Sequence, residues 1–264
     1  MVAIPVRSTL ILWVFCLLIW IPCCVFGEKP PVSVTITGEK AEATYLKGSA
    51  FQVEKGMPSN IALKKGDFLE QGKRFYTDKA SKLELKLPDN SYIRFDEQTT
   101  FELTSVGYNG QQQQRTIHVN MVLGNTWANV SKLFGQHRSF QIATKTAVMG
   151  VRGTVYRVNV QKDDTVIVKV YWGEILINSK PLAGMPQPSG KLTKPSKVSG
   201  PEPIEGPKPV SMEDWTYIVK SMQQMIIRPD GTTTKPFRFS PEEDLDDWVR
   251  WNQQRDAQLK SEQE

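Results

Sequence analysis

Apolar and polar residues alternate along much of the first two thirds of the chain. Leu83, Leu85 and Leu87 are separated by charged residues, and the same period of two recurs at Ile117–Met121 and Val166–Val170. A period of two is typical of a strand with one buried face. The pattern therefore predicts a series of strands, with no helical period between them.

The strands are short, and turn residues punctuate them. "PDNS" at 88–91 and "GYNG" at 107–110 place Pro, Gly, Asn and Asp where turns need them. Strands at intervals of about 8–12 residues are typical of a sandwich, a barrel or a short solenoid. We therefore predict a mainly β fold, a compact antiparallel β sandwich or short β-solenoid-like domain, at residues 28–178.

The composition changes after residue 178. Residues 179–210 hold eight prolines among Gly, Ser and Lys. Proline at this spacing removes the N–H donors that a helix or a ladder needs. We expect an extended, solvated linker here.

The last part of the chain, residues 211–264, has helical spacing. The apolar positions that suggest a first helix are Trp215, Ile218, Val219, Met222, Met225 and Ile226. Ser240-Pro241 is a second helix start, with proline at the first helical position. We predict a small α-helical C-terminal segment that docks within its own chain, on the β domain or on the second helix, in preference to a partner.

The first residues indicate export. One positive charge, Arg7, precedes the apolar run Leu10–Phe26, and Val25-Phe26-Gly27 supplies small or tolerated residues before Glu28. This is the pattern of a secretory signal peptide at residues 1–27, cleaved before Glu28. A retained membrane anchor, or a lipoprotein modified at Cys23 or Cys24, is the alternative. We expect a periplasmic or secreted protein.

The cysteines and the charge exclude several classes of site. All three cysteines lie within residues 1–27, so the mature chain has no disulfide, thiolate metal site or cysteine nucleophile. The formal net charge is +5, and removing Arg7 with the leader leaves +4. This mild charge does not indicate a nucleic-acid partner.

Several motifs carry a family resemblance. "FQIATKTAVMGVRGTVYRV" at 140–158 resembles the signature of the FecR domain, a bacterial extracytoplasmic β module. "LKKGDFLEQGKRFYTDKASKLELKLPDNSYIRF" at 63–95, "LGNTWANV" at 123–130 and "VYWGEILI" at 170–177 are similar to other parts of it. The family often has glycine where this chain has Asn90, and asparagine also tolerates a positive φ.

The resemblance implies a module for contact and sensing, without a known reaction. The family includes transmembrane regulators of iron-transport sigma factors, which carry a cytoplasmic segment before the membrane helix. Only a handful of residues precede the apolar run here. We therefore expect another envelope protein or a polysaccharide as the partner, and no sigma factor.

The family motif places one arginine between two glycines: Gly150, Val151, Arg152, Gly153 and Thr154. Glycine permits a positive φ or a close backbone approach, so the strand can pivot here. Arg152, with five donors, can satisfy carbonyl groups at the pivot, and the Thr154 hydroxyl can close the turn. We favour this structural role over display of Arg152 to an anionic ligand.

Four tryptophans are candidates for a binding surface: Trp127, Trp172, Trp215 and Trp248. Trp127 and Trp172 lie at expected strand ends and can stack on sugars, because an aromatic ring offers a flat apolar area with a polar edge. The alternative is that they belong to the core. A carbohydrate or peptidoglycan-binding module is thus the second hypothesis for function.

No pattern indicates catalysis, a cofactor or a metal site. The chain lacks a nucleophile elbow and a phosphate loop, and its two histidines, His118 and His137, lack ligand spacing. The acidic residues at 242–247 suit an exposed helix start, where they complement the dipole. We expect a binding protein that is not an enzyme.

Overall fold

A computed structural model describes residues 37–38, 40–53, 60–112, 114–132, 138–151, 153–179 and 215–262. The expected leader, all of the expected linker except Ser179, and Arg152 and His137 lie outside these residues. The predictions for the leader and the linker therefore remain predictions. In the described ranges no helix is both long and apolar enough to cross a membrane.

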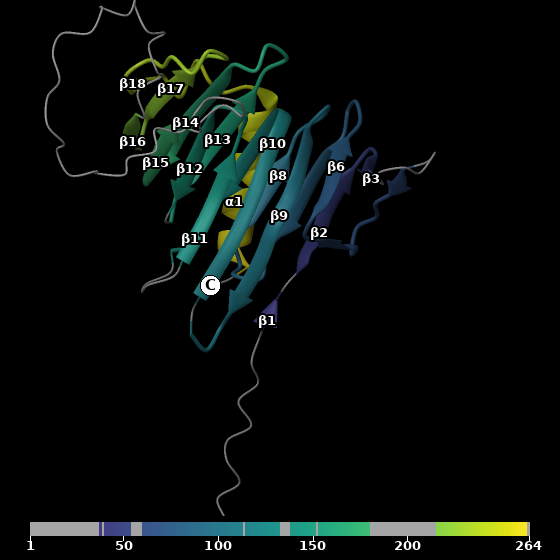
Figure 1. Ribbon diagram of the computed structural model, residues 1–264. Coiled ribbons are helices and arrows are strands. Elements are labelled where there is room, and N and C mark those ends of the chain that lie inside the picture. The colour runs from purple at the N-terminus through teal and green to yellow at the C-terminus, as the bar shows by residue number, and fades with distance from the viewer. Residues whose placement is uncertain are drawn as a thin grey trace, which may run out of the picture. The chain divides into compact units, whose positions relative to one another are not determined.

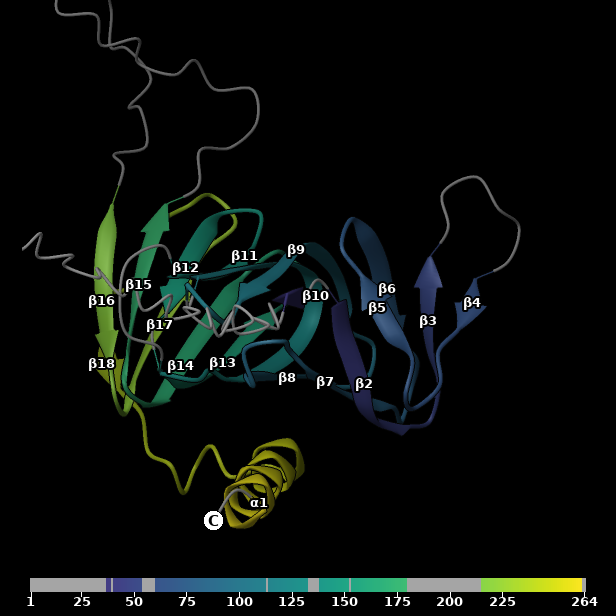
Figure 2. The same ribbon diagram turned by 90° about the horizontal axis from the view of Figure 1, so that it is seen from below.

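Two sheets stack face to face and form a sandwich (Figures 1 and 2). Sheet A runs, in spatial order, β4 (Ile61–Ala62), β3 (Ala50–Val53), β6 (Lys73–Thr77), β9 (Thr100–Asn109), β10 (Gln114–Asn129), β11 (Arg138–Ala143), β12 (Ala147–Val151), β15 (Glu174–Ser179) and β16 (Thr216–Lys220). The short β1 (Thr37–Gly38) pairs with the end of β9.

Sheet B runs β5 (Phe68–Glu70), β2 (Lys40–Lys47), β7 (Lys82–Lys86), β8 (Tyr92–Phe95), β10, β13 (Val155–Val160), β14 (Val166–Trp172), β17 (Gln223–Ile227) and β18 (Phe237–Arg238). The prediction of a mainly β fold is confirmed. Sheet A is mixed, however, because β10 and β11 run parallel.

Strand β10 belongs to both sheets. Its first part pairs with β9 and β11 in sheet A, and from Gly124 onward it pairs with β13 in sheet B. Gly124 has φ +99°, and a Cβ there would lie 2.4 Å from Thr99 Oγ1. Only glycine fits this conformation and this approach, so it sets the place where the strand passes between layers.

The alternating apolar positions of the sequence form the core between the sheets. Leu83, Leu85, Ile117, Val119 and Val168 are all fully or almost fully buried. At the "PDNS" turn Asn90 adopts φ 61°, as the asparagine there was expected to allow. The periodicity therefore predicted both the strands and their buried faces correctly.

The first C-terminal helix was predicted wrongly. Residues 216–220 and 223–227 are strands β16 and β17, and Met222 between them has φ 63°. β16 pairs with β15 in sheet A, while β17 pairs with β14 in sheet B. Each sheet thus captures one strand of this segment, because backbone pairing at two available edges outweighs weak helical spacing.

The second helix forms, but it begins later than predicted. Helix α1 spans Asp247–Ser261, and the Asp246 side chain caps it by accepting a hydrogen bond from the Val249 N–H. Ser240 and Pro241 precede it in a series of turns. The face that contacts the sheet holds Trp248, Val249, Asn252 and Leu259.

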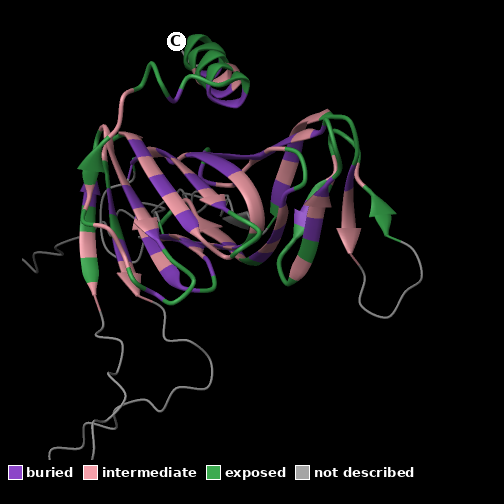
Figure 3. Ribbon diagram, turned by 90° about the horizontal axis from the view of Figure 1, so that it is seen from above, coloured by how far each residue is buried: buried purple, intermediate pink, exposed green. Residues whose placement is uncertain are grey.

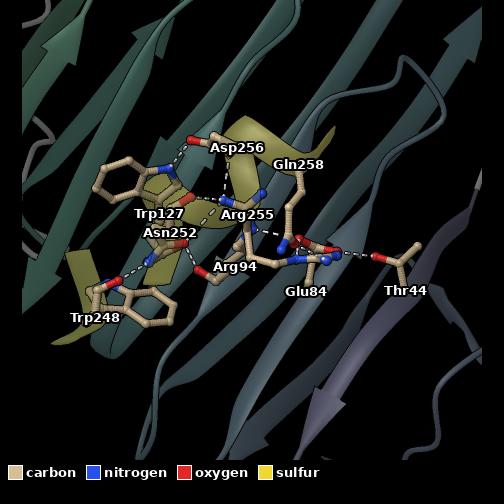
Figure 4. A network of polar contacts seen from close by, with 10 residues as sticks. Thr44, Glu84, Arg94, Trp127, Trp248, Asn252, Arg255, Asp256 and Gln258 are labelled. Atoms are coloured by element: carbon tan, nitrogen blue, oxygen red, sulfur yellow. Dashed lines mark hydrogen bonds and ion pairs between the residues drawn. The ribbon is translucent and has the colours of Figure 1, made fainter. Parts of the chain in front are cut away.

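Helix α1 lies on the outer face of sheet B (Figure 2), and the side that meets the sheet is buried (Figure 3). The contact combines an apolar cluster of Trp127, Trp248 and Val249 with a network of ion pairs and hydrogen bonds (Figure 4). Arg94 on β8 pairs with Glu84 at 2.7 Å and with Asp256 of the helix at 2.8 Å. Arg255 of the helix reaches Glu84 at 2.7 Å. Removing one member would leave buried charge uncompensated, so the network fixes the helix in one place.

A second ionic contact holds the segment before the helix. Asp244 is buried and accepts hydrogen bonds from Arg157, Lys169 and Tyr171 on the same sheet face. The prediction that the C-terminal segment docks within its own chain is therefore correct for the residues described. The acidic run was expected to be exposed, and for Asp244 that expectation is wrong.

Candidate binding groove on sheet A

The outer face of sheet A is the candidate site, and strand register builds it. Pairing across five strands places His118, Gln141, Gly150, Leu176 and Ile218 side by side. Their chain neighbours, such as Phe140 and Val219, point into the core. Successive side chains of a strand point to opposite faces, so this row faces away from sheet B.

The row borders a groove of about 1000 Å³. Gly150 contributes no side chain, and so leaves room between Gln141 and Leu176. Trp172, Leu176 and Ile218 line the groove and are 57%, 42% and 53% exposed. Apolar side chains gathered at one concave place indicate a contact surface, whereas a single exposed apolar residue does not.

The polar and charged residues that line the groove are Thr116, Ser139, Gln141, Glu174, Lys132 and Arg115. His118 lies beside it on the same face, as its place in the alternating strand predicted, and its Nε2 is 2.8 Å from Ser139 Oγ. Partial burial lowers the pKa of His118, so the ring is neutral at pH 7. The groove thus offers charged groups of both signs, together with neutral donors and acceptors, beside its apolar part.

The two glycines of the family motif have different roles. Gly150 lies within β12 without a positive φ, so the expected pivot is not there. Gly153 has φ +61°, and a Cβ on the neighbouring Gly173 would lie 2.7 Å from the Gly153 carbonyl oxygen. The Thr154 hydroxyl donates to the Glu174 carbonyl at 2.9 Å, so the motif joins two connections between strands.

A different arginine, Arg115, is buried at this end of the sandwich, and sequence inspection missed it. Its Nη1 donates to Asp89 Oδ2 at 2.6 Å and to the Ser131 carbonyl at 3.2 Å. Its Nε and Nη2 have no hydrogen-bond partner. The inward position of Arg115 in the alternation of β10 was the available signal, because a charge at such a position requires a buried partner.

The four candidate tryptophans occupy three different places. Trp127 of β10 and Trp248 of α1 are buried where the helix meets the sheet, and Trp127 Nε1 donates to Asp256 at 2.9 Å. Trp215 packs against the edge of the core and donates to the Gly231 carbonyl at 3.0 Å. Only Trp172 of the four lines the groove. The proposed sugar-stacking pair of Trp127 and Trp172 is therefore not formed.

Metal chemistry has no support in the described ranges, which hold no group of three or more His, Cys, Asp or Glu placed to bind an ion. Three other groups with shifted pKa values lie away from the groove. Burial raises the pKa of Tyr156 and of Tyr171, and it also raises the pKa of Asp96. None of these three residues lines the groove.

Comparison with known proteins identifies the domain. Residues 73–176 match the model of the family described as "FecR protein", so the chain carries a FecR domain and the predicted family is confirmed. No curated protein matches the sequence.

The chain is also similar to two crystal structures of a putative anti-sigma factor from Parabacteroides distasonis ATCC 8503. Both are 14% identical, with TM-scores of 0.41 and 0.40. The match covers 62% of this chain and 59% of each of theirs.

One expectation about partners must be corrected. We expected no sigma factor, but residues 73–176 match the FecR family, and the sequence resemblance already implied that this family includes regulators of sigma factors. The exclusion rested on how few residues precede the apolar run. That observation does not outweigh the family match, and the exclusion is withdrawn.

Proposed function

We propose that this protein is a non-catalytic, extracytoplasmic FecR-domain protein that binds another macromolecule through the groove on sheet A. The family match supports a binding and regulatory role. The observation that carries the proposal is the exposed group of Trp172, Leu176 and Ile218 around the space left by Gly150. A protein surface is the favoured partner, because buried aromatic anchors such as tryptophan dominate the binding energy of such interfaces.

A pair of photo-crosslinking substitutions in the cell tests this. A benzoylphenylalanine residue at Leu176 lies in the groove, whereas one at Ile61, which is 52% exposed, lies on the opposite edge of sheet A. We expect a defined crosslinked partner from position 176 only. Equal products from both positions would contradict the proposal.

Trp172→Ala then measures the contribution of the anchor. A hot-spot aromatic contributes about 2 kcal/mol or more, which is roughly a 30-fold loss of affinity. Trp172 is exposed, so the unfolding midpoint should not change. Unchanged affinity for the captured partner would refute the role of the groove.

The groove also supports a second candidate, a polysaccharide ligand. One exposed aromatic ring beside Gln141 and Glu174 provides both stacking and hydrogen bonds to hydroxyl groups. Sedimentation with purified peptidoglycan sacculi separates the two candidates. If the protein binds to sacculi and Trp172→Ala abolishes this binding, the polysaccharide is the favoured ligand of the groove. If Trp172→Ala leaves the binding unchanged, the polysaccharide does not bind in the groove.

A further inference from the structure

We infer that the edge of β16 that faces away from β15 binds an extended segment of a partner protein, which adds a strand to sheet A beside the groove. This inference rests on the proposed function and specifies how the partner is held. Strand addition combines main-chain hydrogen bonds with pockets for alternate side chains.

The direction of the backbone groups comes from the pairing of β15 with β16. The Ser179 N–H donates to the Trp215 carbonyl at 3.0 Å, so this is a hydrogen-bonded pair. In an antiparallel ladder such pairs alternate with non-bonded ones. The uninterrupted register therefore turns the N–H and C=O groups of Thr216 and Ile218 away from β15. In the described part of the chain, β15 is the strand that pairs with β16, whereas β17 pairs with β14 and β18.

The other sheet edges are better protected than β16. The edge strands β4 and β18 have two residues each and β5 has three, whereas β16 has five. β18 also places a charged residue, Arg238, at its end. Natural proteins protect edges by shortening them or by charge, bulges and proline. β16 has no bulge or proline, and its single charge, Lys220, lies at the end of the strand.

Both faces of β16 offer apolar contacts to an added strand. Ile218 and Leu176 are exposed on the outer face. On the inner face Tyr217 and Trp215 are only partly buried and lie 5.7 Å apart between ring centroids. A strand with apolar residues on both faces would cover all four. The occupant is therefore an extended, largely apolar protein segment.

The chain between β15 and β16 is a poor candidate for this place. Its eight prolines remove N–H donors at the spacing where a ladder requires them. A second copy of the protein is the remaining alternative, because two β16 strands can pair about a twofold axis. The experiment must separate that alternative from a partner segment.

The probe is an end-capped heptapeptide of alternating threonine and valine, added to the full chain as the cell produces it. Amide exchange is followed residue by residue. We expect exchange at Thr216 and Ile218 to be fast without peptide and at least tenfold slower at saturation, since these amides gain acceptors.

The matched variants are Ile218→Pro and Ile218→Val. Proline removes the outward N–H without removing a bond to β15, so peptide affinity should fall at least tenfold. Valine keeps the N–H, so affinity should change less than threefold. Thr216→Pro repeats the test if Ile218→Pro lowers the unfolding midpoint.

Three results would overturn the inference. The first is that the peptide fails to bind, and the second is that the Ile218→Pro and Ile218→Val variants bind it equally. The third is that the amides of Thr216 and Ile218 are already protected from exchange in a dimer detected by light scattering. If the partner crosslinks at Leu176 and requires Trp172 but tolerates both proline variants, the groove function stands and the strand addition fails.

Discussion

Glu84→Gln probes the ionic contact that fixes helix α1. Glu84 is on β7, its side chain is fully buried, and it accepts from Thr44 Oγ1 at 2.8 Å, Arg94 Nε at 2.7 Å and Arg255 Nη2 at 2.7 Å. Glutamine has the same shape but no charge. One of its terminal atoms is a donor, which would face guanidinium donors.

The expected cost follows from burial. Removing one partner of a buried ion pair typically costs about 3–5 kcal/mol, because the remaining charge lacks compensation. Arg94 is also fully buried and keeps Asp256 as its second partner, so we expect a cost near 3 kcal/mol. A loss of this size is a large fraction of the stability of an ordinary domain.

Urea unfolding measures the change, and Glu70→Gln is the matched control. Glu70 pairs with Lys40 at 2.9 Å, but both side chains are more than half exposed, so we expect no measurable change. Comparable midpoints for the two variants, or a loss under about 1 kcal/mol in Glu84→Gln, would refute the argument that this network fixes the helix.

The pH dependence gives an independent check. Burial alone would raise the pKa of Glu84, but the hydrogen bond from Arg255 and the charge of Arg94 outweigh it, and the pKa is lowered. The unfolded chain then binds more protons, so the stabilisation is complete above the ordinary carboxyl pKa of about 4.3 and is lost as the pH falls through the lower folded value. The difference between wild type and Glu84→Gln should therefore shrink below about pH 4. A constant difference would contradict this assignment.

Further predictions concern the strand crossover, the C-terminal strands, the leader and the motif arginine. Gly124→Ala should lower the free energy of unfolding by about 2 kcal/mol or more, because it combines a positive φ with a clash against Thr99. Gly66→Ala, with φ +93° and open space around the added Cβ, should cost about 1 kcal/mol. Equal losses of stability in thermal unfolding would contradict this. Truncation at Pro209 removes β16, β17 and α1, so the remaining chain should unfold at a lower temperature or precipitate; an unchanged melting curve would show that these elements are dispensable. N-terminal sequencing of the envelope fraction should begin at Glu28, and Met1 or a lipid-modified cysteine would refute cleavage there. Arg152→Ala should destabilise the domain. Arg152→Lys should restore little stability, since the point charge of lysine does not replace the planar guanidinium group. Retained stability with lost ligand binding would instead indicate that Arg152 is displayed to a ligand.

The sequence by itself determined the strands and their inward faces. Alternation correctly predicted that Val166, Val168 and Val170 are buried. A strand has only two faces, so the period of two is enough to show which residues point into the core. The family motif was also readable, since it occupies one continuous stretch, although the role of Gly150 in leaving space for a groove depended on Leu176 and Gln141 from other strands.

Only the tertiary structure decided which polar positions are buried. In β7 the charged positions appeared to be a solvated face, yet Glu84 is fully buried because α1, more than 160 residues later, covers it. Likewise residues 216–227 have helical spacing in the sequence, but two strands 40 to 60 residues earlier leave edges that they pair with. Local periodicity reports how a segment can bury its apolar side chains, whereas the pairing edges and the covering helix come from distant residues that no local pattern contains.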